Sequence, residues 1–253
     1  MSAPAPELSV VIPAFNEEKR LARTLERVRE YIAAKGFDAE VIVVDDGSSD
    51  DTAKLLEEWC VRMPILRLVS NGRNRGKGYS VCHGMLEARG HIALFTDADL
   101  SAPIEEADKL LSSLNHAEIA IGSRALDRSL ISVHQSRLRE LAGGIFNRIV
   151  RLVTGVGFRD TQCGFKAFVR QPARIIFEQQ RVEGFGFDPE ILFLARRHGL
   201  RAVEIPVRWG HDPATKVRVF RDSLRMFGDL VRIRWNWLLG RYPKEAKPTE
   251  KES

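Results

Sequence analysis

The sequence predicts an α/β fold in which a mostly parallel central sheet is flanked by helices. Along the first half of the chain, short apolar runs alternate with longer segments whose apolar residues recur at helical spacing. The short runs lack polar residues at alternate positions, which is typical of strands buried on both faces. Strands separated by helices in this way form parallel sheets that helices cover.

The individual elements can be assigned in chain order from these patterns. Strands are expected at Leu8–Ile12, Val41–Val44, Ile65–Val69, Ile92–Phe95, Ile119–Ile121, Gly164–Val169 and Ala202–Val207. Helices are expected at Glu17–Ala34, Asp50–Cys60, Gly78–Ala88, His134–Val153, Pro189–His198 and Val217–Leu239.

Length and composition fit one folded domain. The chain has 253 residues, of which 44% are hydrophobic and 29% charged. We expect the domain to cover residues 8–242. Residues 1–7 and 243–253 are polar and rich in proline or charge, so both ends are expected to be disordered.

Basic residues outnumber acidic ones, and the excess is unevenly spread. There are 39 Lys and Arg against 34 Asp and Glu, with the basic residues crowded into 124–174 and 196–234. This indicates an anionic partner such as a nucleotide or lipid phosphate, or else a solvated basic surface. Nucleic acid is not expected, because the sequence has neither an aromatic-rich RNA-binding motif nor a zinc pattern.

The cysteines and the chain start favour a cytoplasmic protein. Cys60, Cys82 and Cys163 are odd in number and form no CxxC pair, which favours a reducing compartment. No signal peptide is visible, and no run of about 18 uncharged apolar residues predicts a membrane-spanning helix.

Polar or special residues follow each of the first five predicted strands. These groups are Pro13–Glu17, Asp45–Asp50, Asn71–Gly78, Asp97–Asp99 and Gly122–Arg124. Ligands of open α/β sheets bind beyond the carboxyl ends of the strands. The five groups are therefore expected to line one cleft.

Asp97 and Asp99 are candidate metal ligands. Residues two apart in an extended segment point the same way, so their carboxylates repel each other unless a cation lies between them. Mg²⁺ or Mn²⁺ takes carboxylate and phosphate oxygens together and would neutralise a bound diphosphate. The alternative is a turn with two capping aspartates.

Asp45, Asp46 and Lys77 are candidate nucleotide-binding residues. Carboxylates at a strand end can accept hydrogen bonds from ribose hydroxyls or a base edge. The alternative is capping of the next helix, and both roles can hold together. Lys77 lies between two glycines that let the backbone approach a ligand. The spacings of a P-loop and of a GxGxxG dinucleotide motif are both missing.

Taken together, the segments VVIPAFNEE, VIVVDDGSSD, NRGKG, FTDADLS, GSR and RDTQCGFKAF resemble those of family 2 glycosyltransferases. The resemblance runs from about Leu8 to Leu238 and is greatest to the dolichyl-phosphate β-glucosyltransferases and dolichol-phosphate mannose synthases. It implies a GT-A type nucleotide-binding fold. It also implies an inverting transfer of a sugar from a nucleotide-sugar donor to a polyprenyl phosphate.

The DTQCGFK segment favours glucose from UDP-glucose as the transferred sugar. Two alternatives stay open: mannose from GDP-mannose, and transfer to a soluble hydroxyl acceptor. The chain departs from its relatives in two ways. Ser101 stands where mannose synthases often carry Gln, and the membrane anchor of the eukaryotic glucosyltransferases is not visible.

The resemblance assigns roles to individual residues. Asp97 and Asp99 would hold Mg²⁺ or Mn²⁺ against the donor diphosphate, and Arg124 and Arg139 would bind the acceptor phosphate. The other expected substrate contacts are Pro13, Asn16, Glu17, Asp46, Lys77, Lys166 and, in a loop closing over the phosphates, Lys216 and Arg218.

A phosphate acceptor changes what the catalytic residues must do. A phosphate monoester has a second pKa of about 6 and is largely ionised at neutral pH. It needs positioning and charge cancellation more than a base. Asp160, Asp188 and Glu190 remain candidate bases, with helix-end roles as the alternative. Asp99, Arg124, Asp160 and Asp188 are the expected catalytic residues.

Two amphipathic segments suit contact with a membrane surface. His134–Val153 and Arg221–Leu239 both interleave arginines with apolar side chains, and the second also carries Trp235 and Trp237. Such helices can lie at a lipid interface, although ordinary core packing is the alternative. We therefore expect a peripheral protein at the cytoplasmic face of a membrane.

Overall fold

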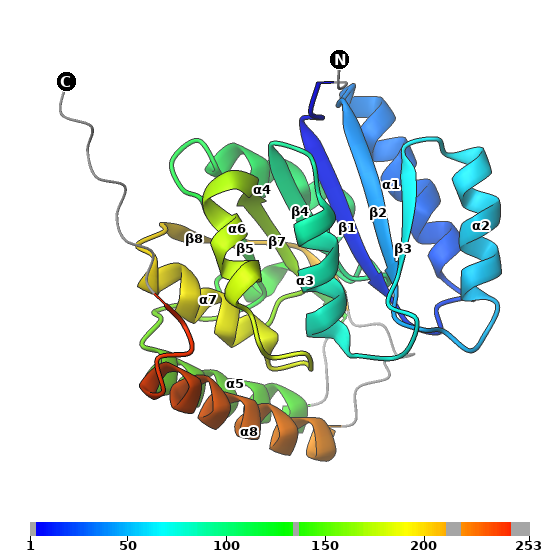
Figure 1. The fold of residues 1–253 in the computed structure, drawn as a ribbon. Helices are drawn as coiled ribbons and strands as arrows, with labels where there is room; N and C mark the ends of the chain where they lie inside the picture. Colours follow the sequence, from blue (N-terminus) through cyan, green and yellow to red (C-terminus); the bar gives the residue numbers. More distant parts are fainter. Residues whose placement is uncertain (1–3, 134–136, 211–218, 244–253) are drawn as a thin grey trace.

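The computed structural model describes residues 4–133, 137–210 and 219–243, and it contains a seven-stranded sheet with helices on both faces (Figure 1). The strand order is β3-β2-β1-β4-β7-β5-β8. The strands are β1 (Leu8–Ala14), β2 (Ala39–Asp45), β3 (Leu66–Ser70), β4 (Ile92–Thr96), β5 (Ile119–Ser123), β7 (Phe165–Val169) and β8 (Ala202–Pro206). Only β7 runs antiparallel to its neighbours, which confirms the mostly parallel α/β fold.

Eight α-helices surround the sheet in the described part of the chain. They are α1 (Leu21–Lys35), α2 (Thr52–Arg62), α3 (Lys77–Glu87), α4 (Ala107–Ser113), α5 (Arg137–Thr154), α6 (Arg170–Gln179), α7 (Phe187–Arg197) and α8 (Val219–Leu238). One hydrophobic core joins α1, α2 and α4 to the sheet, and a second joins α3, α5, α6, α7 and α8 to the opposite face.

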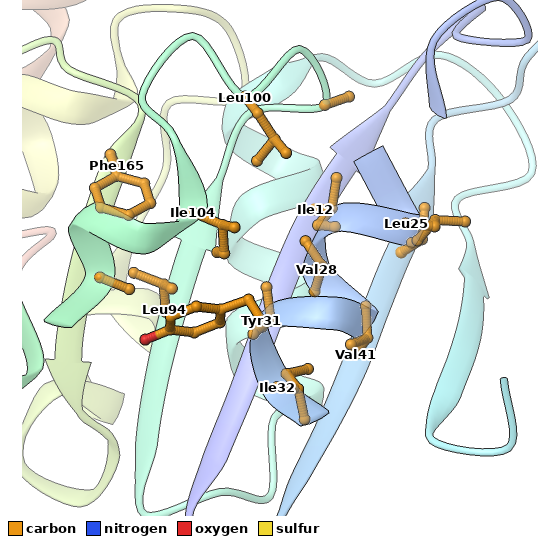
Figure 2. Close-up of a cluster of buried hydrophobic side chains, with 14 of the residues drawn as sticks. Ile12, Leu25, Val28, Tyr31, Ile32, Val41, Leu94, Leu100, Ile104 and Phe165 are labelled. Atoms are coloured by element: carbon orange, nitrogen blue, oxygen red, sulfur yellow. The ribbon is translucent and has the colours of Figure 1, made fainter. Parts of the chain in front are cut away.

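Successive side chains along each strand belong alternately to the two cores. In β1, Val10 and Ile12 belong to the first core and Val11 to the second, as successive strand residues point to opposite faces. Figure 2 shows Ile12 packed in the first core near Leu25 and Val28 of α1. The predominance of apolar residues in β1 and β2 thus reflects helices on both sides of the sheet.

Some elements differ from the sequence-based expectations. The first helix begins at Leu21 rather than Glu17, because the amide of Glu17 donates to the hydroxyl of Thr52 and residues 17–20 form a turn. Helices α4 and α6 and the small sheet of β6 (Ile131–Val133) and β9 (Trp209–Gly210) were not expected. Residues 1–3 and 244–253, most of the ends expected to be disordered, lie outside the described residues.

The direction of β7 gathers the site at one edge of the sheet. Strands β1 to β5 are parallel, so their carboxyl ends share one edge. Because β7 is antiparallel and lies between β4 and β5, its amino end reaches the same edge and brings residues 160–164 with it. Helices α5 and α8 pack side by side and against α7, below this edge in Figure 1.

Candidate active site

The loops after β1 and β2 are tied together by hydrogen bonds. The amide of Asn16 donates to Ser48 Oγ at 2.9 Å, and Asn16 Oδ1 accepts from the amide of Ser49 at 2.7 Å. Asn16 has a φ of 55°, a left-handed conformation that asparagine tolerates better than most residues. Pro13 lies near the end of β1, beside Val44 of β2. These predicted nucleotide-pocket residues therefore share one edge of the sheet.

Asp46 holds the loop that leads to Lys77. Its buried carboxylate accepts hydrogen bonds from the side-chain amide of Asn71 at 2.7 Å and from the amides of Arg75 and Gly76 at 2.9 and 2.8 Å. This arrangement makes Asp46 an organiser of the loop. Asp45, also buried, accepts more weakly from the amide of Ser48 at 3.2 Å.

Lys77 reaches the predicted metal ligands. It is the first residue of α3, and its Nζ lies 2.5 Å from Asp97 Oδ1. Burial lowers the pKa of Lys77, but the carboxylates of Asp97 and Asp188 outweigh it and raise the pKa above its usual value. Gly76 before it has a φ of 107°, and a Cβ there would lie 2.5 Å from the carbonyl oxygen of Glu183. Glycine is therefore required for this approach.

Asp97 and Asp99 form an acidic pair at the end of β4. Burial and the charge of Asp97 raise the pKa of Asp99, whose Oδ1 accepts from the amide of Ser101 at 2.9 Å. The loop before β7 lies directly against this pair, since a Cβ on Gly164 would lie 2.1 Å from Asp97 Oδ2.

The acidic pair fits a divalent cation that completes its shell with substrate. Among the described residues no group of three His, Cys, Asp or Glu side chains could hold a metal. Mg²⁺ commonly takes one or two carboxylates, substrate phosphates and water, so two aspartates are enough. Burial comes first among the causes that raise the pKa of Asp99, and repulsion from Asp97 adds to it; a cation between the two carboxylates would relieve that repulsion.

Arg124 and Asp160 form a two-point ion pair at the end of β5. Arg124 Nε and Nη2 lie 2.7 and 2.9 Å from the two carboxylate oxygens, which also accept from the amides of Arg124 and Gln162. Burial raises the pKa of Asp160, but Arg124 outweighs it and holds the pKa below its usual value. With its oxygens occupied, Asp160 is better placed to orient Arg124 than to act as a base.

Two other predicted residues are deeply buried. Lys166 is 0% exposed, and its Nζ lies 2.5 Å from Asp188 Oδ1 and 2.6 Å from the carbonyl oxygen of Cys163. Burial raises the pKa of Asp188, although Lys166 and Lys77 oppose the shift. The charge of Asp188 also raises the pKa of Lys77, so this buried pair is coupled to the Lys77–Asp97 contact.

Glu190 lies apart from these groups. It is fully buried, and its carboxylate accepts hydrogen bonds from the hydroxyl of Tyr242 and from the amides of Arg181 and Val182. These contacts attach the segment after α8 to α7. They leave Glu190 no contact with the acidic pair at the end of β4 among the described residues, so a role as base finds no support in the geometry.

An arginine-rich pocket of about 380 Å³ lies beside Arg124. Arg148 and Arg151 enter it from α5 and Arg159 from the loop before β7, and among the described residues no carboxylate pairs with these three. The ring of Trp209 lies 5.4 Å from the Arg124 guanidinium carbon. Several arginines around one hollow suit an anionic group such as phosphate.

The remaining predicted residues cannot be compared with this geometry. Arg139 belongs to α5, but its side chain is outside the described residues, as are Lys216 and Arg218. Arg148 and Arg151 lie in the segment His134–Val153, for which the sequence predicted an amphipathic helix and no phosphate site. Their spacing of three on one helix was the available signal for a shared site. Arg159 and Trp209 carried no such signal.

A mostly parallel sheet with an acidic pair, a lysine loop and an arginine pocket at its carboxyl edge defines a GT-A type glycosyltransferase. The same architecture occurs in glucosyl-3-phosphoglycerate synthase from Mycobacterium tuberculosis, solved in complex with Mn²⁺, UDP and glucosyl-3-phosphoglycerate. That structure is 21% identical with a TM-score of 0.58, and the match covers 96% of this chain and 82% of the other. Mannosyl-3-phosphoglycerate synthase from Rubrobacter xylanophilus is 17% identical with a TM-score of 0.66, and the match covers 96% and 78% of the two chains.

The chain belongs to glycosyl transferase family 2, whose model matches residues 9–175. A dolichyl-phosphate beta-glucosyltransferase of Trichomonas vaginalis is 37% identical in a match that covers 89% of this chain and 72% of the relative. The dolichyl-phosphate beta-glucosyltransferase of Homo sapiens is 36% identical in a match that covers 96% of this chain and 79% of the relative. These matches confirm the family and the branch that the motifs predicted.

Proposed function

We propose that the protein transfers glucose from UDP-glucose to a polyprenyl phosphate of the dolichyl or undecaprenyl type, with inversion at the anomeric carbon. The observation that carries the proposal is the arginine pocket that Arg124 shares with Arg148, Arg151 and Arg159, at the same sheet edge as Asp97. The relatives named as dolichyl-phosphate beta-glucosyltransferases support the same donor sugar and acceptor.

The donor would lie over the carboxyl ends of β1 to β4. Asp97 and Asp99 would hold Mg²⁺ or Mn²⁺, which when bound neutralises the charge of the diphosphate leaving group. Lys77 is held at the acidic pair by Asp97 and can turn its ammonium group to the diphosphate. Asn16, Glu17 and Asp45 would contact the nucleoside, on loops that Asp46 and Ser48 fix.

The acceptor phosphate would occupy the arginine pocket. Its oxygen is largely ionised at neutral pH, since the second pKa of a phosphate monoester is about 6. Arg124, oriented by Asp160, would align that oxygen with the anomeric carbon, while Arg148, Arg151 and Arg159 cancel its charge. Such a reaction needs no general base, in keeping with the occupied or buried state of Asp160, Asp188 and Glu190.

Helix α8 would bring the site to a lipid surface. Its exposed apolar residues lie three or four apart on one face, and the arginines of α5 and α8 suit anionic headgroups. The apolar stripe, named here the α8 stripe, consists of Phe227, Val231, Trp235 and Leu238, which are 48 to 66% exposed. No helix in the described ranges is both long and apolar enough to cross a bilayer. The free cysteines favour the cytoplasmic face.

A transfer assay tests the proposed function. Purified protein with Mn²⁺ and farnesyl phosphate would be given labelled UDP-glucose or labelled GDP-mannose, and label would be counted in the organic phase. We expect organic label from UDP-glucose, lost on chelation. Organic label from GDP-mannose alone would overturn the sugar and keep the acceptor. Release of UDP only when soluble sugars are added would move the acceptor to a hydroxyl.

Disrupting the α8 stripe is expected to weaken membrane binding. Changing Phe227 and Trp235 together to serine removes two exposed apolar side chains, so sedimentation with vesicles of anionic phospholipid should fall by about tenfold or more. Transfer to farnesyl phosphate in detergent should stay within about twofold, as the stripe lies outside the pocket.

The matched control is Val61→Ser, since Val61 is 84% exposed on α2, in the other helical layer. The Val61→Ser protein should bind vesicles as the wild type does. Equal vesicle binding by all three proteins would contradict the role of α8.

A further inference from the structure

One side chain of α5 joins that helix to the loop before β7. Asn147 donates from its side-chain amide to the carbonyl oxygens of Phe158 and Arg159 at 3.2 and 2.7 Å. Its carbonyl oxygen accepts from the hydroxyl of Thr161 at 2.8 Å. Thr161 is fully buried and Asn147 half-buried, so this contact is only partly open to water.

The same loop is held on its other side by strand β8. Glu204 accepts from the amides of Arg159 and Asp160 at 3.0 and 2.7 Å. Asp160 then holds Arg124 through both carboxylate oxygens. A series of hydrogen bonds thus connects the sheet, through the loop, to Arg124. Asn147 connects α5 to the same loop.

Helix α5 carries two arginines of the pocket. Arg148 directly follows Asn147, and Arg151 lies one turn further along the helix. Their distance from Arg124 depends on how α5 sits against the loop. At the pocket, Asn147 is itself a lining residue and supplies hydrogen bonds from α5 to three loop residues.

We propose that Asn147 is a positioning residue that sets the span between Arg124 and the two arginines of α5, and so the affinity for the acceptor phosphate. The inference rests on the proposed phosphate acceptor. Without Asn147, Glu204 and Asp160 still hold Arg124, but Arg148 and Arg151 lose their fixed distance from it. The acceptor should then bind more weakly while the donor site is unchanged.

The test compares Asn147→Ala with Thr154→Val in the full chain. Thr154 also lies on α5 and is buried, but its hydroxyl donates to the carbonyl oxygen of Val150 in the same helix at 2.7 Å. The hydroxyl also accepts from the amide of Val156 at 3.4 Å, at the start of the loop, so its loss should cost stability but leave the contacts of Asn147 with residues 158–161 in place. Asn147→Ala should raise the KM for farnesyl phosphate by about tenfold and leave the KM for UDP-glucose within about twofold. Thr154→Val should leave both constants within about twofold of wild type.

Hydrogen exchange measures how firmly the loop is held without any substrate. Amides of residues 158–162 should exchange faster in Asn147→Ala than in wild type or Thr154→Val, because the loop has lost its anchor on α5. If the wild type transfers sugar and Asn147→Ala has an unchanged KM for farnesyl phosphate, the positioning role of Asn147 is overturned and the proposed function stands.

Absence of transfer in the wild type would overturn the proposed function instead. The hydrogen-exchange measurement would then test the positioning role of Asn147 independently of transfer. Faster exchange confined to the Asn147→Ala loop would support its positioning role, and equal exchange in all three proteins would overturn it.

Discussion

Replacing Asp99 with alanine is expected to lower sugar transfer by at least about 10²- to 10³-fold, the usual cost of removing one preorganised electrostatic group. Asp99 and Asp97 are the acidic pair at the end of β4, and burial together with the charge of Asp97 raises the pKa of Asp99. Loss of one carboxylate leaves a divalent cation with a single protein ligand. The rate of label transfer at increasing Mn²⁺ concentration measures this effect.

Two further variants make the Asp99 result specific. Asp99→Asn keeps the shape but removes the charge and should be nearly as damaged, with an increased requirement for Mn²⁺. Asp38→Ala removes an exposed aspartate that precedes β2, at the opposite edge of the sheet, and should retain wild-type activity. If Asp99→Ala transfers sugar at the wild-type rate and is inhibited by chelators as the wild type is, the metal does not bind at Asp99.

Replacing Lys166 with methionine is expected to destabilise the fold by about 3–5 kcal/mol, the cost of leaving a buried charge without its partner. Lys166 is fully buried on β7, and Asp188 is its ion-pair partner at 2.5 Å. For a domain of this size the change corresponds to a fall in melting temperature of about 6–20 °C. Urea and thermal denaturation measure it.

The pH dependence of the Lys166→Met protein follows from Asp188. Burial raises the pKa of Asp188, and removal of Lys166 takes away a cation that opposes the shift. A carboxyl with a raised folded-state pKa destabilises the fold as pH rises through that pKa, and protonation relieves the penalty as pH falls. The difference in unfolding free energy between Lys166→Met and wild type should therefore shrink in acid.

The double variant and a surface pair provide the controls. Lys166→Met combined with Asp188→Asn removes both charges and should recover part of the lost stability. Lys35 and Asp108 lie at the same distance of 2.5 Å but are 41% and 45% exposed, so Lys35→Met should cost less than about 1 kcal/mol. Equal losses for Lys166→Met and Lys35→Met would contradict the role assigned to burial.

Local patterns were enough to predict which loops meet at the carboxyl edge of the sheet. The strands before Pro13, Asp45, Asn71 and Asp97 are mostly apolar, and parallel strands separated by helices place their carboxyl ends together. The contact between Lys77 and Asp97 follows from that shared edge. Residue spacing alone could not distinguish a side chain that contacts the ligand from one that supports a loop. The three hydrogen bonds that Asp46 accepts show that it supports the loop before Lys77.

By itself, then, the sequence determined the α/β class, the family and the edge of the sheet at which the candidate site residues meet. These depend on periodicity and on motifs within short segments. Only the tertiary structure decided the antiparallel insertion of β7, the pairing of Arg124 with Asp160 and of Lys166 with Asp188, and the approach of Arg124 to the arginines of α5 and of the loop that follows it. The two residues of each ion pair are separated by 22 or more positions in the sequence. Their contacts arise from strand order and helix packing, which local spacing does not encode.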